Sequence, residues 1–298
     1  MFVIKFKKIF IGISIALMAI AIASVIFFGL KPGIDFTGGS SLELTYTGVR
    51  PETSEVSGAL VNAGYGDALI QALGTNDIAI KTRTLTETER ANVVTLASVD
   101  GKYTLEQRSF TTIGPSVGNE LKKKAIASIM LVLIAIVLFV AYAFRKVSNP
   151  VSSWKYGFVV IIALIHDIII PTGVFAVLGH YYGFEVDTLF IVALLTTLGL
   201  SVADTIVVFD RIRENLTSKQ GKPFEQLVGE SLSQTFGRSI STSFVVLVMV
   251  LSLALFGPQS TKIFSTVLAI GMFFGTYSSI FLASPLLVVI EKLQHKKK

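Results

Sequence analysis

The sequence contains no cysteine among its 298 residues. Disulfide bonds, thiol catalysis and cysteine-ligated zinc are therefore excluded. Only three histidines are present, His166, His180 and His295, and they are scattered, so the H-E-x-x-H pattern of a metalloprotease is absent. The G-x-x-x-x-G-K-[ST] loop of a P-loop ATPase is absent as well. We therefore expect a protein that is not an enzyme and that needs no metal or organic cofactor.

Charged residues are also scarce, at 15% of the chain, whereas 52% of the residues are hydrophobic and the mean hydropathy is +0.69. Such a composition is too apolar for a soluble globular protein and is typical of a polytopic membrane protein. The net charge of +6 comes from lysines and arginines that cluster in short segments between apolar runs. Membrane topology explains this distribution better than nucleic-acid binding does.

Six apolar runs are long enough to cross a bilayer as helices. They comprise residues 9–30, 125–144, 156–178, 189–209, 240–256 and 263–290. A cleaved signal peptide is the competing interpretation of the first run, because Ala21-Ile22-Ala23 resembles a cleavage site. The run exceeds the about 7–15 residues of a signal-peptide core, which favours a retained span. The last run is long enough to tilt, or to break near Ser284-Pro285.

The segment 31–121 has a different character, because its apolar runs are short and alternate with polar residues. The patterns predict, in order, strand 41–46, helix 51–63, strands 68–73 and 77–82, helix 86–97 and strand 103–113. Thr86 and Glu89 form a capping-box pattern at the start of the second helix. This order of elements favours a small α+β domain of the ferredoxin-like type. Its sequence has no cluster of acids, histidines or nucleophiles, so we expect binding or coupling from it.

The predicted fold class is therefore a mainly α membrane protein with six transmembrane helices and a ferredoxin-like domain between the first two. We divide the chain into three parts, residues 1–30, 31–121 and 122–298. The first holds the amino terminus and span one, and the second is the external α+β domain. The third holds spans two to six, an amphipathic loop at 210–237 and a basic carboxyl-terminal tail.

Basic residues lie mostly on one side of the predicted spans. They precede span one, follow spans two and four, and fill the tail: Lys5, Lys7, Lys8, Arg145, Lys146, Lys155, Arg211, Arg213, Lys219, Lys222, Lys292, Lys296, Lys297 and Lys298. The positive-inside rule then places both termini in the cytoplasm and residues 31–121 outside. Lys122, Lys123 and Lys124 lie on the outer side against this trend, but charges that follow a long translocated domain count less.

One carboxylate, Asp204, lies within the run 189–209, six residues before the polar segment that begins at Asp210. An ionisable group inside an apolar span is costly and indicates a functional site. Helical spacing puts Thr197, Ser201 and Asp204 on one face, which should contact other helices or a water-filled cavity. A carboxylate near a helix end that reaches toward headgroup water is the competing interpretation.

Two other places combine polarity with an apolar run. His166-Asp167 lies near the middle of span three and is followed by Pro171, which frees a backbone carbonyl and can kink the helix. Arg238 is predicted at the start of span five, where a cation opposes the helix dipole and favours a carboxylate partner such as Asp204. If Arg238 approaches and withdraws, protonation of Asp204 becomes coupled to helix movement. A positive-inside anchor for Arg238 and a hydrogen-bonded core histidine for His166 remain open alternatives.

The loop before Arg238 carries an apolar stripe. Its members recur at helical spacing: Phe224, Leu227, Val228, Leu232 and Phe236. We expect them to form an amphipathic helix on the inner membrane surface.

An ordered set of short motifs resembles the SecF family of protein-export membrane proteins. Residues 33–39 resemble the signature that opens the family's periplasmic domain, and residues 114–121 resemble its entry into span two. His166-Asp167 matches its span three, residues 203–215 its most specific motif, and residues 236–240 the start of its span five. Each motif alone is weak, but the set covers nearly the whole chain in the expected order. The motif residues carried over are Gly33, Asp35, Phe36, Gly38, Gly39, Asp210, Arg211, Arg213, Glu214 and Asn215.

The resemblance implies one half of a transporter of the resistance–nodulation–division superfamily, with SecD as the other half on a separate chain. It implies that the pair assists the SecYEG channel in the bacterial inner membrane, with YajC and SecA-dependent preproteins as further expected partners. The proton-motive force would then help to draw the preprotein out on the periplasmic side. In this family the residues that match Asp204 and Arg238 belong to the proton pathway, so protons are the expected coupling ion. For His166 and Asp167 the resemblance implies importance without fixing a role, and together with Thr197 and Ser201 they are expected to be supporting polar groups inside the membrane.

Two other functions compete with this interpretation. A proton-coupled transporter of small molecules or lipids from the same superfamily would usually have two six-span halves and larger external domains. A passive assembly subunit would use its polar groups only to hold helices together.

Overall fold

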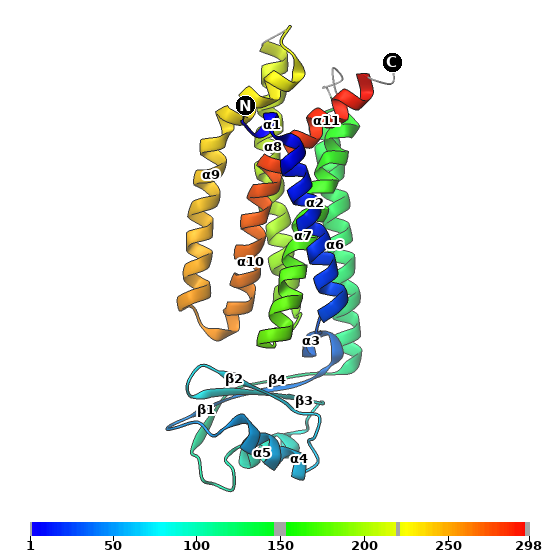
Figure 1. Cartoon of the computed structure of the whole chain (residues 1–298). Helices are drawn as coiled ribbons and strands as arrows, with labels where there is room; N and C mark the ends of the chain where they lie inside the picture. Colours follow the sequence, from blue (N-terminus) through cyan, green and yellow to red (C-terminus); the bar gives the residue numbers. More distant parts are fainter. Residues whose placement is uncertain (1, 146–152, 219–220, 296–298) are drawn as a thin grey trace. The chain divides into compact units, whose positions relative to one another are not determined.

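The computed structural model describes residues 2–145, 153–218 and 221–295 (Figure 1). The chain divides into two compact units. One, here called the helical unit, comprises Met1–Leu30, Ala127–Phe184 and Leu189–Lys298. The other, the sheet unit, comprises Lys31–Ile126 and Glu185–Thr188, so it includes four residues that the sequence analysis left in the loop between spans three and four.

Six helices in the described residues are long and apolar enough to cross a membrane. After a short α1 (Phe2–Lys5) they are α2 (Lys7–Phe28), α6 (Pro115–Ala143), α7 (Ser153–Tyr182), α8 (Thr188–Ser218), α9 (Phe224–Phe256) and a sixth made of α10 (Gln259–Tyr277), a π-helix η1 (Ser278–Ala283) and α11 (Ser284–His295). The predicted six spans and the mainly helical fold are therefore confirmed.

Three of these spans, α7, α8 and the last one, form the centre of the helical unit. In their most apolar stretches 56%, 44% and 56% of the residues are buried, against 11% in α2 and 6% in α6. Aromatic rings close one part of this core: Phe144, just after α6, stacks on Tyr156 of α7 at 5.2 Å, and Phe209 of α8 meets Tyr156 edge-on at 5.3 Å. A polar side chain on the buried face of α7 or α8 therefore has other helices as its surroundings.

The helix α10 approaches α8 closely through Gly271 and Gly275, which form a G-x-x-x-G pair. A Cβ atom added to Gly271 would lie 2.3 Å from Thr197 Oγ1, and one added to Gly275 would lie 3.0 Å from Ser201 Cβ. Small residues at this spacing let two helix backbones come together in a membrane. The polar face of α8 therefore packs against α10.

The predicted amphipathic helix and the predicted fifth span are one continuous helix, α9. Because α9 begins at Phe224, Arg238 lies inside the helix, and the predicted conflict with the dipole of a helix start was wrong. The surface location of the apolar stripe was wrong as well. The first four residues of the stripe are buried in the core that also holds Phe209 and Ile212 of α8, and they are Phe224, Leu227, Val228 and Leu232. Of the stripe, only Phe236 is exposed. The apolar stripe therefore packs against the end of α8 and not against the membrane surface.

The last span contains the irregularity predicted near Ser284-Pro285, in the form of the π-helix η1 that ends at Ala283. Proline has no N–H group and cannot continue the regular helical hydrogen bonding toward the preceding turn. The hydroxyl of Ser284 donates instead to the carbonyl of Ser279 at 3.3 Å. Such π segments inside α-helices are frequent at functional sites.

The sheet unit has the predicted ferredoxin-like topology. Its antiparallel strands lie in the order β2-β3-β1-β4, with α4 (Thr53–Asn62) and α5 (Glu87–Ala97) on one face (Figure 1). The strands are β1 (Gly39–Tyr46), β2 (Leu69–Leu73), β3 (Asp77–Thr82) and β4 (Leu105–Ile113). Each predicted element of this unit is present, with ends within two residues of the prediction.

Alternate residues of β1 form the core of the sheet unit. Leu42, Leu44 and Tyr46 are buried against α4 and α5. The Tyr46 hydroxyl donates to the carbonyl of Ala97 at the end of α5 at 2.9 Å, and burial raises the pKa of Tyr46 to about 12. Helix α5 begins at the predicted capping box, in which the Thr86 hydroxyl accepts a hydrogen bond from the Glu89 N–H.

Candidate functional site

The centre of the helical unit holds a cluster of buried polar side chains. They come from α7, α8 and η1, and each is at most 5% exposed: His166, Asp167, Thr197, Ser201, Thr205, Ser278 and Ser279. A buried polar group costs free energy unless it is hydrogen-bonded, and a buried charge costs more. The hydrogen bonds inside this cluster therefore decide what each member can do.

Asp167 is the charged member at the centre of the cluster. Its Oδ1 lies 3.0 Å from Nδ1 of His166, and its Oδ2 accepts a hydrogen bond from the Ser201 hydroxyl. Pro171 lies four residues later and has no N–H, so the Asp167 carbonyl also lacks its usual donor within α7. Asp167 thus joins α7 to α8.

Hydroxyl groups continue the cluster from α8 into η1. Thr205 Oγ1 lies 2.8 Å from Ser279 Oγ, which in turn lies 3.2 Å from the Ser201 carbonyl and 3.0 Å from the Gly275 carbonyl. The hydrogen bonds of a π-helix span one residue more than those of an α-helix, and this shifts its side chains around the helix axis. Through Ser279, the irregular part of the last span is therefore hydrogen-bonded directly to α8.

Asp204 lies one turn away from this cluster and is half-buried. It lines a small cavity of ≈ 10 Å³ together with Thr197 and Ser201, so the three residues of the predicted polar face point into one space. Its Oδ2 atom is buried and has no hydrogen-bond partner within the described part of the chain. A carboxylate in this setting can bind a proton or a polar group in the cavity.

Arg238 lies on α9 and is exposed on the surface of the helical unit. It is near enough to act electrostatically on Asp204, and Ser239 lies next to the same carboxylate. Over the described ranges it forms no ion pair within 4.0 Å, so the predicted partner is a neighbour of Asp204 but not in a salt bridge with it. Arg238 and Asp204 are therefore neighbours on different helices, without a salt bridge between them.

The polar end of α8 fastens this helix to α9. Asn215 is 3% exposed and donates to Ser231 Oγ at 2.7 Å and to Gln234 Oε1 at 2.9 Å, both on α9. Arg211 donates to the same Gln234 oxygen at 2.6 Å. Two ion pairs within α8, Arg213–Asp210 and Arg211–Glu214, both at 2.5 Å, complete the segment. These motif residues fix the register of α9, and with it the position of Arg238.

The glycine-rich motif of residues 33–39 lies in the sheet unit. It folds into a single helical turn, α3 (Ile34–Thr37), followed by Gly38 at φ +77° and Gly39 at φ +140°. Only glycine adopts such angles without strain, and a Cβ atom on Gly38 would lie 2.9 Å from Cα of Pro115. The two motifs around residues 33–39 and 114–121 therefore pack against each other. Asp35 also accepts a hydrogen bond from the Thr188 N–H at 2.8 Å, and Phe36 is part of the same turn.

The contribution of the last span was missed in the sequence analysis. Its polar groups in the cluster are Ser278, Ser279 and the Gly275 carbonyl, and Tyr277 stacks on His166 with ring centres 6.1 Å apart. The available signal was the G-x-x-x-G pair followed by Ser278-Ser279 in an otherwise apolar run.

Six helices apolar enough to cross a membrane, with a buried set of carboxylate, imidazole and hydroxyl groups among them, define a multi-pass membrane protein. In the part of the chain that the structure describes, no group of three or more His, Asp or Glu side chains could hold a metal ion. The sequence pattern of the family "Protein export membrane protein SecD/SecF, C-terminal" matches residues 93–293, and the SecD/SecF GG motif matches residues 23–48. The chain belongs to the SecD/SecF family.

Similar proteins agree with this assignment. The chain is 41% identical to the protein translocase subunit SecF of Thermobaculum terrenum over 96% of its own length and 92% of the relative's. It is 36% identical to that of Anaerolinea thermophila, with the same coverage. Among solved structures it matches SecDF, a translocon-associated membrane protein from Thermus thermophilus, at a TM-score of 0.84 and 30% identity. It covers 38% of that longer SecDF chain, and a SecDF structure in a super-membrane-facing form matches at a TM-score of 0.69.

Proposed function

We propose that the chain is the SecF-type accessory subunit of a protein translocase and works with a separate SecD-type chain. The observation that carries this proposal is the likeness to relatives named protein translocase subunit SecF over more than nine-tenths of their length. The chain spans 38% of the matching SecDF structure, which supports a SecD-type partner for the remainder. The alternative, a half-size transporter of small molecules or lipids, is not favoured by these relatives.

The coupling ion in this proposal is the proton, and Asp204 is its binding group. Binding of a proton neutralises Asp204 and removes its attraction for Arg238. Two unit charges about 4 Å apart attract by about 4 kcal/mol at an effective dielectric constant of about 20. About 5.5 kcal/mol moves a two-state equilibrium from 1:99 to 99:1. Because Arg238 is exposed, solvent screening reduces this attraction toward the about 0–1 kcal/mol of a surface pair, so protonation of Asp204 would bias the position of the Arg238 side chain and would need further contacts to shift α9.

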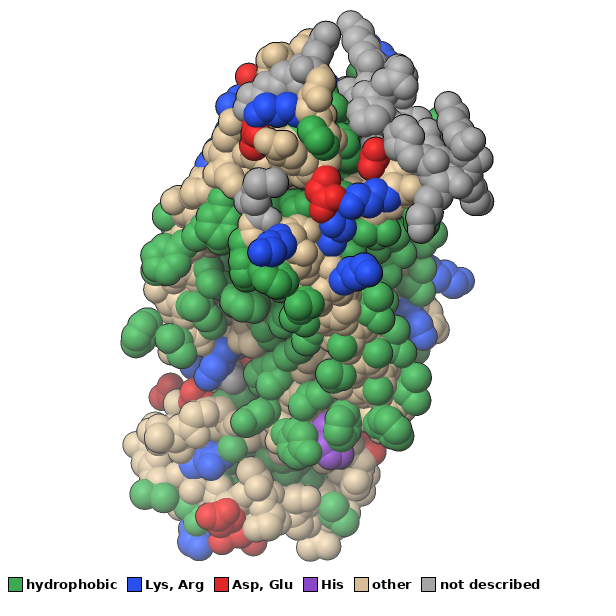
Figure 2. All heavy atoms as spheres, turned by 45° about the horizontal axis from the view of Figure 1, so that its top comes forward, with side chains coloured by type: hydrophobic (Ala, Val, Ile, Leu, Met, Phe, Trp, Pro, Cys, Tyr) green, Lys and Arg blue, Asp and Glu red, His purple; other side chains and the backbone are tan. Residues whose placement is uncertain are grey.

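The proposed orientation has both termini in the cytoplasm and the sheet unit in the periplasm, in the inner membrane of a bacterium. The helices nearest the two termini, α1 and α11, lie at the same end of the helical unit (Figure 1). There Glu225 of α9 pairs with Lys7 of α2 and with Lys292 of α11. Figure 2 shows a largely apolar surface on the flank of the molecule, with several Lys and Arg side chains toward that end. Lys146, Lys219 and Lys296–Lys298, which also entered the topology prediction, lie outside the described residues.

The proposed partners are the SecD-type chain, the SecYEG channel, YajC and a preprotein delivered by SecA. Neither a nucleic acid nor a cofactor other than the proton is part of the proposal. Nor is any enzymatic activity: the family is named for protein export. The sheet unit would contact the emerging preprotein or the external domain of the SecD-type chain.

The test is preprotein release from vesicles that contain the chain and its SecD-type partner, with a proton gradient first imposed and then collapsed. We expect Asp204→Asn to keep the complex assembled and to abolish the part of release that depends on the gradient. Glu106→Gln is the matched control, because Glu106 is an exposed carboxylate on β4. Gradient-dependent release and proton conductance at the wild-type level in Asp204→Asn would instead support a passive assembly subunit.

A further inference from the structure

The side chain of Ser201 belongs to two parts of the site at once. Its hydroxyl donates to Oδ2 of Asp167, and the same residue lines the cavity in front of Asp204. Asp167 is completely buried and Ser201 is 5% exposed. Ser201 therefore connects Asp167, through a hydrogen bond, to the small cavity that Asp204 lines.

The cavity contains oxygen atoms that lack partners. Thr197 Oγ1, on a residue that is 0% exposed, and Asp204 Oδ2 are both buried without a hydrogen-bond partner among the described residues. The volume of ≈ 10 Å³ is about the least that accommodates one water molecule, which needs two to four polar neighbours. Thr197, Ser201 and Asp204 provide that number.

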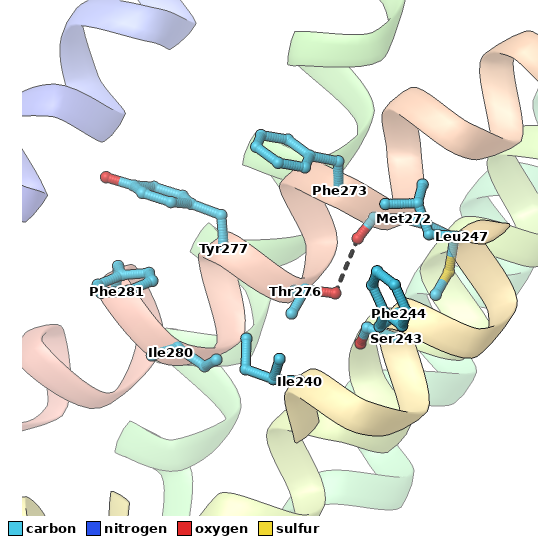
Figure 3. A pocket seen from close by; sticks show the side chains of 10 residues that line it. All are labelled: Ile240, Ser243, Phe244, Leu247, Met272, Phe273, Thr276, Tyr277, Ile280 and Phe281. Carbon is cyan, nitrogen blue, oxygen red and sulfur yellow. Dashed lines mark hydrogen bonds between the residues drawn. The ribbon is translucent and has the colours of Figure 1, made fainter. Parts of the chain in front are cut away.

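A larger and almost wholly apolar pocket of ≈ 220 Å³ borders this cavity between α9 and the last span (Figure 3). The two spaces share Ser243, Met272 and Thr276. The Thr276 hydroxyl already donates its proton to the Met272 carbonyl of its own helix, at 2.9 Å (Figure 3). The apolar side chains of the larger pocket cannot relay a proton. The polar path from the cavity therefore leads through Ser201 to Asp167.

His166 lies beyond Asp167, at the end of the path from the cavity through Ser201. Its Nδ1 faces Asp167 at 3.0 Å, and its Nε2 is buried with no partner in the described ranges. The titratable groups around Asp167 are His166 on α7, Asp204 across the cavity on α8, and Tyr277. The ring of Tyr277 stacks on His166, and its hydroxyl donates to the Phe10 carbonyl at 3.2 Å. A proton that reaches Asp167 can thus be shared with the imidazole.

We propose that Asp167 is a second proton-holding group, which exchanges its proton with Asp204 through the Ser201 hydroxyl and one water molecule in the cavity. This inference rests on the proposed role of Asp204. In the transfer, the acid O–H bond of Asp204 breaks and its proton binds the water. The water passes another proton to Ser201 Oγ, while the original Ser201 proton bonds to Oδ2 of Asp167. Asp204 becomes the carboxylate and Asp167 the neutral acid, and nothing is oxidised or reduced.

The transfer also changes a contact between helices. A neutral Asp167 no longer attracts the Ser201 hydroxyl as a carboxylate does. Ser201 Oγ already lies 3.4 Å from the Gly275 carbonyl of α10, which is the remaining acceptor within reach. Movement of the proton therefore shifts the hydroxyl from an α7–α8 bond to an α8–α10 bond, next to the π-helix.

The experiment uses the full complex with its SecD-type chain in lipid vesicles. Infrared difference spectra after a pH jump would record the carboxylic-acid bands, and a dye would record proton uptake. We expect Asp167→Asn to remove one band, Asp204→Asn to remove its own band and to delay or abolish that of Asp167, and Ser201→Ala to keep the Asp204 band while slowing the Asp167 band and proton uptake about tenfold or more. Ser265→Ala is the matched control and should behave as wild type, because Ser265 is 0% exposed and bonds only to carbonyls of its own helix, Thr261 and Lys262.

The outcomes separate this inference from the proposed function. Wild-type proton uptake in Ser201→Ala and Asp167→Asn, combined with loss in Asp204→Asn, would overturn the inference alone. Wild-type uptake in Asp204→Asn would overturn the proposed role of Asp204 and the inference together. Should the Asp167→Asn complex not assemble, Ser201→Ala decides, because an Asp167 band that rises at the wild-type rate without the hydroxyl would contradict the relay.

Discussion

The two units of the chain differ in the charged groups that they bury completely. The sheet unit carries ion pairs at its surface, such as Arg83–Glu89 and Arg108–Asp77, in which the arginine side chains are 50% and 61% exposed. The helical unit holds a carboxylate and an imidazole at zero exposure in Asp167 and His166. Exposed pairs contribute about 0–1 kcal/mol each, whereas a buried charge is costly unless every partner is present. The exposed charges of both units are therefore replaceable, whereas Asp167 and His166 in the helical unit each need a specific partner.

The sharpest test of this difference compares the removal of one charge from each unit. We expect Asp167→Ala to destabilise the protein by about 3 kcal/mol or more, because it leaves His166 and the Ser201 hydroxyl without their partner in a buried site. Arg108→Ala should cost about 1 kcal/mol or less. Thermal unfolding of both variants in the same detergent measures the difference. Equal losses of stability would show that burial does not decide the importance of a charge in this chain.

Backbone strain gives the sheet unit its own sensitive position. We expect Gly38→Ala to destabilise the protein by about 1–3 kcal/mol, because a side chain at φ +77° is strained and its Cβ atom would meet Pro115. Gly48→Ala is the control, since nothing lies within 4 Å of a Cβ atom at that position. The same unfolding measurement applies, and similar stability of the two variants would show that the motif is not retained for its backbone geometry.

Arg238 is an intermediate case, since it belongs to the helical unit but is exposed. We expect Arg238→Lys to lower gradient-dependent preprotein release about three- to tenfold, because lysine keeps the charge and loses the planar fork that fits a carboxylate. Arg108→Lys in the sheet unit should leave release unchanged. Wild-type release from Arg238→Lys would mean that Arg238 only anchors the membrane topology.

The sequence predicted local features well where one short pattern decides the structure. Period-two alternation identified the strands of the sheet unit, and the Thr86–Glu89 capping box marked the start of α5. Hydropathy identified all six spans, because a run of apolar residues has few alternatives in a folded chain. The polar face of α8 followed from helical spacing alone.

The features that depend on contacts between distant segments were not predictable in this way. The apolar stripe that begins at Phe224 fits a membrane surface as well as it fits the end of α8, and only the fold decides between them. The contribution of Ser279 depends on the π-helix, whose extra residue per turn no periodic pattern anticipates. The bond between Ser201 and Asp167 joins residues 34 positions apart.

The smallest expected effect concerns Glu89, a carboxylate of the sheet unit whose side chain is 28% exposed. The hydrogen bond from Arg83, together with those from the backbone and hydroxyl of Thr86, lowers the pKa of Glu89 to about 2 from its ordinary value of 4.5. Because the pKa is lowered by folding, the contribution of these bonds to stability is present above pH about 4.5 and is lost as the pH falls toward about 2. We expect Arg83→Gln to raise the pKa of Glu89 only part of the way, since the bonds from Thr86 remain. A pH titration of the Glu89 carboxyl resonance by NMR in the full chain measures this, and an unchanged pKa in Arg83→Gln would assign the whole shift to the helix cap.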